Sequence, residues 1–216
     1  AREVIIQVDD RIPIMDGAPV VPSDRISQVT EVASVGIPTL VLGRSSSSGE
    51  IIGQSVASII REGDTVQLGL GSLGPQIAEQ LAKGCQHLGI HTGLLDDAVM
   101  DLIDSGAVDN LGKDLDRGWS VTPIVMGSSN LYQRVRNRSD IRLRPVDETN
   151  DPSFIAGIPN FVSVNSAIEV DLLGQVNAEF VGNERVSTTG GQLDYVMGSR
   201  LSKGGRSVVV LPSTAG

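Results

Sequence analysis

The sequence has little cysteine, few aromatic side chains and no cluster of positive charge. Cys85 is the one cysteine in 216 residues, which excludes an intrachain disulfide. Because no further metal-ligand pairs accompany it, the thiol does not indicate a zinc site. Aromatic residues make up 3% of the chain, so we expect a core built from aliphatic side chains.

Long hydrophobic runs are also absent. No segment approaches the roughly 18 apolar residues of a membrane span, and no signal peptide opens the chain. These absences predict a cytoplasmic protein without a membrane partner. The net charge is −9, whereas nucleic-acid phosphates require clustered cations. We therefore expect no nucleic-acid partner, and the partly basic run 134–138 is interpreted as a solvated face.

The stretch with the most definite pattern is 65–94, which predicts a strand, a glycine turn, a helix and a second strand. Residues 65–68 favour a strand, and 69–74 read GLGSLG. Pro75 suits the first helical position, and Lys83-Gly84 suits a helix end. An apolar run at 88–91 predicts the next strand. This βαβ unit would place backbone amides at its turn, where an anionic ligand can bind.

The turn 69–74 also matches the dinucleotide spacing G-x-G-x-x-G. An NAD site would need an acidic residue at the end of the second strand, but Thr92-Gly93 stand there. Three interpretations remain: a turn that needs glycine for steric reasons, an acyl or phosphate site, and an NAD site.

Strands and helices are predicted along the rest of the chain. The expected strands are 3–8, 37–42, 120–126, 161–165 and 207–211, with a hairpin formed by 168–172 and 175–178. The expected helices are 50–62, 96–105, one opening at 127–129, 152–157 and 192–202. Their alternation predicts an α/β fold with an open, mostly parallel sheet and helices on both faces. The turns 69–74 and 189–191 and the pair Thr92-Gly93 would then meet at the carboxyl ends of the strands, where such sheets bind ligands.

Taken together, these segments resemble the acetyl-CoA hydrolase/transferase family of class I coenzyme A transferases, with the nearest likeness to 4-hydroxybutyrate and butyrate CoA-transferases. The motifs are QLGLGSLG (67–74), LGIHTGLLDDAVMDLIDSGAV (88–108), NDPSFIA (150–156), VSVNSAIEVDLLGQVNAE (162–179), TGGQLDYVMG (189–198) and SKGGRSVVVLPSTA (202–215). The resemblance covers mainly 50–216, which we expect to be a second CoA-transferase-like domain, incomplete at its C-terminus. Residues 1–49 would be the tail of a first such domain, with the linker in the loop 44–49.

The resemblance implies a fold of the CoA-transferase type and a ping-pong reaction. In this family a glutamate carboxylate attacks the acyl-CoA thioester, which gives a mixed anhydride and then a glutamyl-CoA thioester. An incoming carboxylic acid then reverses these steps. Motif matching places Leu70 and Gly71 at the oxyanion-side turn and Gly190 and Gly191 in the loop that lines the acyl pocket. Backbone amides at such turns can hold the developing oxyanion.

The sequence departs from the family at position 93. The nucleophilic glutamate should follow the strand end Ile90-His91-Thr92, but Gly93 stands there, and glycine has no side chain to form an anhydride. The chain is then a member that binds CoA without transfer, an enzyme that works by another route such as hydrolysis, or a silent subunit whose partner supplies the carboxylate.

Other titratable residues are considered as replacements. Asp96 and Asp97 suit helix capping better than catalysis, and Glu169 and Asp171 suit structural support of the hairpin. Glu179 is less constrained. His91 could orient a water, although a histidine at a strand end is more often packed and hydrogen-bonded. Lys203 could contact a CoA phosphate or a carboxylate, or be an ordinary turn lysine.

The sequence therefore predicts a CoA-transferase or acyl-CoA hydrolase acting on short-chain acyl-CoA and a carboxylic acid. We expect no tightly bound cofactor and no metal, and either a homo-oligomer or a partner chain that completes the fold. The alternatives are a non-catalytic CoA-binding or scaffolding subunit and a dinucleotide-binding enzyme that uses the turn 69–74.

Overall fold

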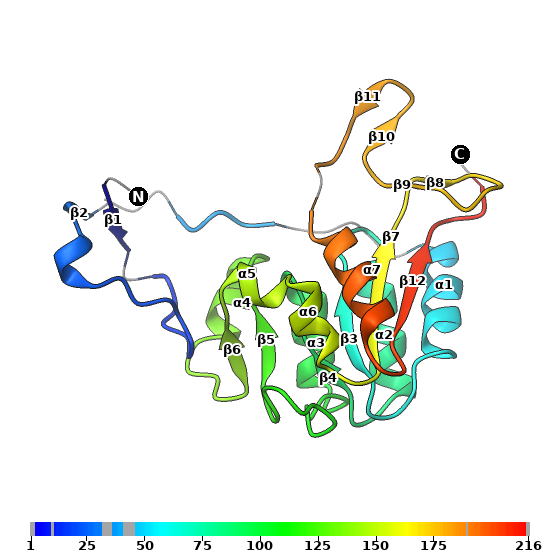
Figure 1. Cartoon of the computed structure of the whole chain (residues 1–216), viewed down its shortest axis with the longest axis horizontal. Helices are drawn as coiled ribbons and strands as arrows, with labels where there is room; N and C mark the ends of the chain where they lie inside the picture. The colour runs from blue at the N-terminus through cyan, green and yellow to red at the C-terminus, as the bar shows by residue number, and fades with distance from the viewer. Residues whose placement is uncertain (1–2, 10, 32–35, 41–45, 189, 215–216) are drawn as a thin grey trace.

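The fold is built around a four-stranded parallel sheet. The computed structural model describes residues 3–9, 11–31, 36–40, 46–188 and 190–214. The strands are β3 (Thr65–Leu68), β4 (Gly89–Ile90), β7 (Phe161–Ser166) and β12 (Arg206–Val210), and their order is β12-β7-β3-β4 (Figure 1). Every pairing within this sheet is parallel. The carboxyl ends of all its strands therefore lie at one edge, here called the carboxyl edge.

The sheet continues less regularly beyond β4. The strands β5 (Ser120–Thr122) and β6 (Ile141–Leu143) form a parallel pair, and single bridges at His91 and Leu95 join the segment of β4 to the segment of β5. A further bridge joins Asp16 to Arg142, and this contact ties the N-terminal segment to β6.

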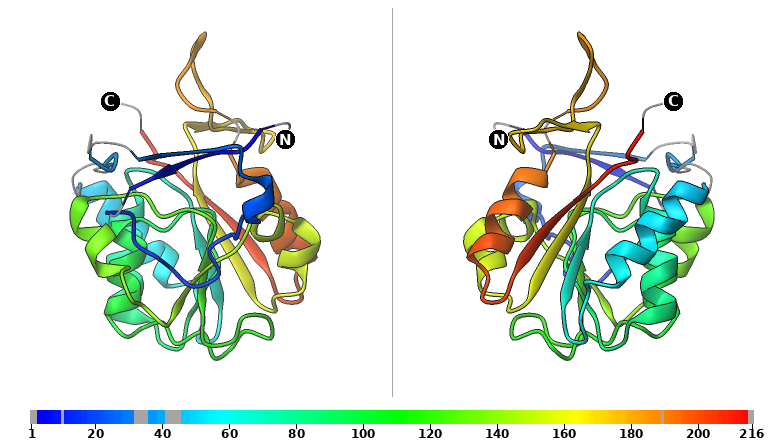
Figure 2. Two further views of the ribbon diagram at one scale, coloured as in Figure 1. Left: turned by 90° about the vertical axis from the view of Figure 1, so that its left-hand side faces the viewer. Right: turned by 90° about the vertical axis from the view of Figure 1, so that its right-hand side faces the viewer.

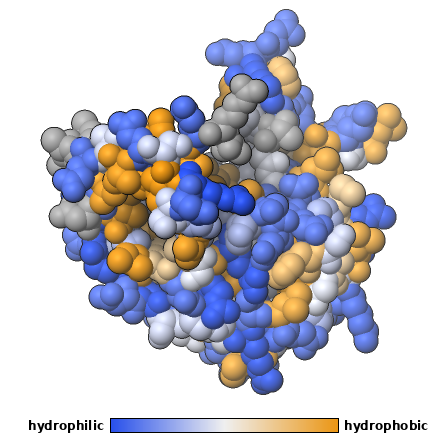
Figure 3. Space-filling view, turned by 60° about the vertical axis from the view of Figure 1, so that its left-hand side comes forward, coloured by the Kyte–Doolittle hydropathy of each residue, from blue (hydrophilic) through white to orange (hydrophobic). Residues whose placement is uncertain are grey.

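The N-terminal segment forms a small unit at one side of the molecule. The strands β1 (Ile5–Val8) and β2 (Gln28–Glu31) pair in parallel, with the short 3-10 helix η1 (Ser23–Arg25) between them (Figure 1). The side chains of Ile14 and Val20 are both 89% exposed. A space-filling view with this side turned forward shows apolar residues gathered around a hollow (Figure 3).

Helices cover both faces of the sheet, as the alternating pattern predicts (Figure 2). The helices are α1 (Ser47–Ala57), α2 (Gly74–Gly84), α3 (Asp97–Asp104), α4 (Ser129–Arg134), α5 (Val146–Thr149), α6 (Pro152–Ala156) and α7 (Gln192–Leu201). On one face, α1, α2 and α3 pack an aliphatic core against Val66 and Val164. On the other face, a smaller cluster joins Phe161 to Tyr195 of α7 and Ile155 of α6.

Two hairpins follow β7 and project from the body (Figure 1). The strands β8 (Glu169–Val170) and β9 (Val176–Asn177) form the predicted hairpin, and β10 (Phe180–Val181) pairs with β11 (Glu184–Arg185) in a second one. The Asp171 carboxylate accepts hydrogen bonds from the backbone amides of Leu173 and Gln175, each at 2.8 Å. This confirms its predicted role as structural support.

Several boundaries differ from the prediction. Ser46 caps α1, so the helix begins at Ser47 and ends at Ala57 instead of covering 50–62. Residues 47–49 of the predicted loop are therefore helical, and 44–45 lie outside the described residues. The strand predicted over 120–126 stops at Thr122, because Pro123 has no N–H for the ladder. Residues 37–40 carry no strand, and 41–42 lie outside the described residues.

Candidate functional site

The turn after β3 is fixed against the end of β7. The Gly69 amide donates to the Val164 carbonyl at 2.8 Å. A Cβ built at Gly69 would lie 2.5 Å from Asn165 Oδ1, so only glycine fits there. Below the turn, the buried amides of Gln67 and Asn165 bond each other reciprocally at 3.1 and 3.0 Å. This pair joins β3 to β7 where the turn begins.

Leu70 and Gly71 lie in this turn at the carboxyl edge. The Leu70 side chain is 47% exposed. A Cβ at Gly71 would lie 3.1 Å from Ser166 Oγ, at the end of β7. Both residues therefore lie at the carboxyl edge, as the sequence predicts for the turn 69–74.

The end of β4 is joined to the same edge through Thr92. Its hydroxyl donates to the Leu68 carbonyl at 3.1 Å. Gly93 follows and packs against the ring of Tyr195: a Cβ at Gly93 would lie 3.2 Å from Tyr195 Cε2 and 3.3 Å from its hydroxyl oxygen. Position 93 is thus covered by an aromatic ring from α7.

Tyr195 also joins the glycine loop that precedes α7 to the loop between α5 and α6. Its hydroxyl donates to Asn150 Oδ1 at 3.1 Å. A Cβ at Gly191 would collide with Asn150 Nδ2 and lie 3.2 Å from Tyr195 Cε2, whereas Gly190 faces open space. The structure thereby brings Gly93 and Gly191 against one side chain. Thr189 lies outside the described residues.

Lys203 is separated from these residues. Its carbonyl accepts a hydrogen bond from the Asn160 amide at 2.9 Å, immediately before β7 begins. Lys203 itself stands shortly before β12. Because β7 and β12 are parallel, this is the amino-terminal edge of the sheet, opposite Leu70, Gly71, Gly190 and Gly191.

His91 is a packed residue directly after β4, near the carboxyl edge. Its Nε2 lies 2.9 Å from the Thr149 carbonyl oxygen, and its ring stacks on Phe154 with centroids 5.7 Å apart. Burial lowers the pKa of His91 to about 4, so the ring is neutral near pH 7. Nδ1 is buried and has no hydrogen-bond partner in the described part of the chain.

The acidic residues near the site serve local structure. Asp96 caps α3 by accepting from the Val99 amide at 2.9 Å, which confirms the predicted cap. Asp97 accepts from the Ser128 amide and hydroxyl at 2.7 and 2.6 Å. In the hairpins, Glu169 accepts from Asn177 and Glu179 from Arg185, both at 2.8 Å.

A buried lysine, Lys113, bonds the end of β4, and the sequence pattern does not indicate it. Lys113 Nζ donates to the carbonyls of Ile90 and Trp119 at 3.0 and 2.6 Å. Burial lowers the pKa of Lys113 to about 7. Asp116 lies nearby and accepts a two-pronged bond from Arg144 at 2.8 and 2.7 Å. Nothing in the polar stretch 106–118 marks Lys113 as an interior residue.

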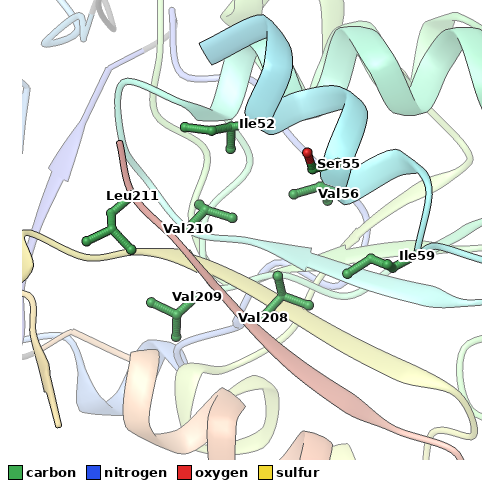
Figure 4. Close-up of a pocket in the computed structure, with 8 residues that line it drawn as sticks. All are labelled: Ile52, Ser55, Val56, Ile59, Val208, Val209, Val210 and Leu211. Carbon is green, nitrogen blue, oxygen red and sulfur yellow. The ribbon is translucent and has the colours of Figure 1, made fainter. Parts of the chain in front are cut away.

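An apolar cavity of about 260 Å³ lies away from these residues, along β12 (Figure 4). Its lining residues are Ile52, Ser55, Val56, Ile59, Val208, Val209, Val210 and Leu211. They come from α1 and the segment after it, from β12 and from Leu211 just beyond β12, and none of them is titratable. The cavity therefore offers no group for acid or base chemistry, and its one hydroxyl, that of Ser55, donates to the Ile51 carbonyl at 2.9 Å.

None of the helices in the described residues is both long and apolar enough for a bilayer span. No group of three or more His, Cys, Asp or Glu side chains is arranged to hold a metal ion within these residues.

Comparison with known proteins agrees with the resemblance seen in the motifs. Residues 127–216 match the acetyl-CoA hydrolase/transferase C-terminal domain. The chain is 36% identical to 4-hydroxybutyrate coenzyme A transferase of Clostridium kluyveri, over 100% of this chain and 50% of that protein. It is 32% identical to butyryl-CoA:acetate CoA-transferase of Anaerostipes caccae, over 98% of this chain and 48% of that protein.

Solved structures give the same result. RipA from Yersinia pestis superposes with a TM-score of 0.92 at 35% identity, over 100% of this chain and 49% of that one. A 4-hydroxybutyrate CoA-transferase from Porphyromonas gingivalis gives a TM-score of 0.86 at 34% identity, over 99% and 51%. The chain spans about half the length of the relatives it matches.

Proposed function

We propose, on the premise that this chain belongs to the acetyl-CoA hydrolase/transferase family, that the protein acts on short-chain acyl-CoA thioesters. The observation that carries the proposal is the carboxyl edge itself. Three segments whose motifs resemble this family meet at that edge. They are the turn with Leu70 and Gly71, the end of β4 at Gly93, and the loop with Gly190 and Gly191. We assign the thioester to this edge, with backbone amides around the carbonyl oxygen.

The acyl group would then leave sulfur by one of two routes. In hydrolysis, a water oxygen bonds to the carbonyl carbon, the carbon–sulfur bond breaks, and the water proton passes to the CoA thiolate. In transfer, a carboxylate must attack instead. Gly93 provides none, and Asp96 and Asp97 are engaged in helix contacts. Hydrolysis is therefore the favoured route for this chain by itself, and transfer requires a carboxylate from a partner chain.

A non-catalytic CoA-binding subunit is the second candidate, and position 93 is the observation that favours it. Glycine there removes the usual nucleophile, and the chain spans about half of its relatives. A homologous partner carrying the glutamate would complete such an assembly.

We propose residues 1–49 as the tail of a preceding domain and 50–216 as the second domain. We also propose a cytoplasmic homo- or hetero-oligomer without a tightly bound cofactor.

We do not favour the dinucleotide alternative. β4 is followed by His91, Thr92 and Gly93, so the strand end lacks the carboxylate that would hold the ribose hydroxyls. Gly69 and Gly71 stand against Asn165 and Ser166, which explains these two glycines of the turn in steric terms.

The test is a side-by-side assay of the purified native assembly with butyryl-CoA, with and without acetate. Butyrate with free CoA would establish hydrolysis. Butyrate with acetyl-CoA would establish transfer and a carboxylate outside position 93. CoA binding without either product would establish the non-catalytic subunit. Neither turnover nor CoA binding would overturn the proposal, and saturable NAD binding in that case would favour the dinucleotide alternative.

A further inference from the structure

A second hollow lies at the amino-terminal end of β12, on the opposite edge of the sheet from the proposed thioester site. It has a volume of about 750 Å³, and its lining residues are Ser58, Ile59, Arg61, Arg200, Gly205, Arg206, Ser207 and Val208. They come from the segment after α1, from α7, from the turn at Gly205 and from β12. Three arginines around one hollow stand out in a chain with a net charge of −9.

Within the described residues, a carboxylate neutralises one of these arginines. Arg206 forms an ion pair with the buried Asp64 and donates to the Ile59 carbonyl at 3.3 Å. Arg206 Nε is buried and has no hydrogen-bond partner among the described residues. Arg61 and Arg200 have no side-chain hydrogen bond or ion pair in the part of the chain that the structure describes. Within the described residues, the hollow therefore presents two guanidinium groups without an ion pair.

The helix dipole explains only part of this arrangement. Arg200 lies in the last turn of α7, where a cation is favoured by the partial negative charge of the helix end. Arg61 belongs to a different segment, four residues beyond the end of α1, and yet lines the same hollow. Guanidinium groups that line one hollow without an ion pair among the described residues are stabilised when an anion binds there.

We propose that this hollow binds a phosphate-bearing ligand, at a site separate from the thioester edge. Guanidinium groups present several N–H donors in a plane and bind phosphate oxygens in pairs. Lys203 is exposed and stands two residues before Gly205 in the sequence, at the same edge of the sheet. This placement assigns the sequence-predicted anion contact of Lys203 to the amino-terminal edge. β12 has five residues, so at about 3.3 Å per residue the two edges are roughly 15 Å apart.

The phosphate has two possible sources: the phosphate groups of coenzyme A and a free phosphate or nucleotide. Isothermal titration of the native assembly with 3′,5′-ADP and with inorganic phosphate tests the site without any turnover. We expect Arg61→Gln and Arg200→Gln each to weaken 3′,5′-ADP binding about tenfold, and added salt to weaken binding to the wild type. Arg117→Gln is the matched control, because Arg117 is exposed and outside the hollow.

Comparison of CoA with dephospho-CoA distinguishes the sources. If the ligand is the 3′-phosphate of coenzyme A, dephospho-CoA binds more weakly than CoA to the wild type, and Arg200→Gln removes the difference. If the ligand is instead a free phosphate or nucleotide that is not part of CoA, 3′,5′-ADP binds to the protein without displacing CoA. Equal affinity of the wild type and both arginine variants would overturn the proposal, as would an equal loss in Arg117→Gln. A change in the melting temperature of the arginine variants without a change in 3′,5′-ADP binding would show that polypeptide fills the hollow. That result would also overturn the proposal. None of these outcomes depends on acyl-CoA turnover, so the proposed function is tested separately.

Discussion

The ring of Tyr195 packs directly over Gly93. A Cβ at position 93 would lie 3.2 Å from Tyr195 Cε2 and 3.3 Å from the hydroxyl oxygen, while that hydroxyl donates to Asn150 at 3.1 Å. A side chain at position 93 must therefore displace the ring by a few tenths of an ångström. The absence of a side chain at position 93 and the packing of α7 are consequently linked.

Gly93→Glu is expected to raise acyl transfer from butyryl-CoA to acetate by about an order of magnitude, because it supplies a carboxylate nucleophile. The displaced Tyr195 ring should reduce the free energy of unfolding by about 1 kcal/mol. Mass spectrometry of protein incubated with acyl-CoA should detect a covalent glutamyl-CoA adduct.

Gly93→Gln is the matched control for this variant. Its side chain has nearly the same shape but no nucleophilic carboxylate, so it should lose the same stability and form no adduct. A folded Gly93→Glu protein that binds CoA but shows neither adduct nor faster transfer would contradict the prediction.

Replacement by alanine should change the free energy of unfolding differently at the adjacent residues Gly190 and Gly191. Gly191→Ala would place a methyl group against Asn150 Nδ2, so we expect a loss of about 1–3 kcal/mol in the free energy of unfolding. Gly190→Ala faces open space and should change it by less than about 0.5 kcal/mol. Urea denaturation of the two variants measures both values, and similar losses would show that the contact with Asn150 is unimportant.

The amide pair below the turn 69–74 gives a third prediction. Asn165→Leu would leave the Gln67 amide buried without its partner, which should cost about 2–3 kcal/mol of unfolding free energy. In the double variant with Gln67→Leu both polar groups are gone. The combined loss should therefore be smaller than the sum of the two single losses, and strict additivity in urea denaturation would contradict a direct pair.

Lys113 should make stability depend on pH in the alkaline range. Its pKa is lowered to about 7 in the folded protein by burial, against about 10.4 in an unfolded chain. Between these values the unfolded state binds the additional proton, so the free energy of unfolding should rise as the pH is raised from about 7 to 10. A neutral amine still has two N–H groups for the carbonyls of Ile90 and Trp119.

Lys113→Met is expected to lose this pH dependence. The difference in unfolding free energy between wild type and variant, measured by urea denaturation at pH 7, 8, 9 and 10, cancels groups that titrate in both proteins. A constant difference over this range would mean that the lysine keeps its ordinary pKa.

The parallel sheet could be predicted because its signals are local. The β-favouring run 65–68, the glycine turn and the periodic apolar positions of α2 define a βαβ unit within 30 residues. The caps at Asp96 and Asp151 are also local, since each side chain bonds an amide two or three residues away. The carboxyl-edge position of Leu70 and Gly71 then follows from strand direction alone.

Long-range packing decided the rest. No sequence spacing indicates that Tyr195 of α7 covers Gly93, that Lys113 is buried beneath β4, or that Arg61 and Arg200 line one hollow. Lys203 is a candidate anion contact from its motif, and only the direction of β12 shows that it lies at the amino-terminal edge, away from Leu70 and Gly71. The sequence by itself determined the order and direction of the elements, because hydrophobic period and turn residues act over a few positions. Only the tertiary structure decided which side chains meet, because those contacts depend on how distant segments fill a shared volume.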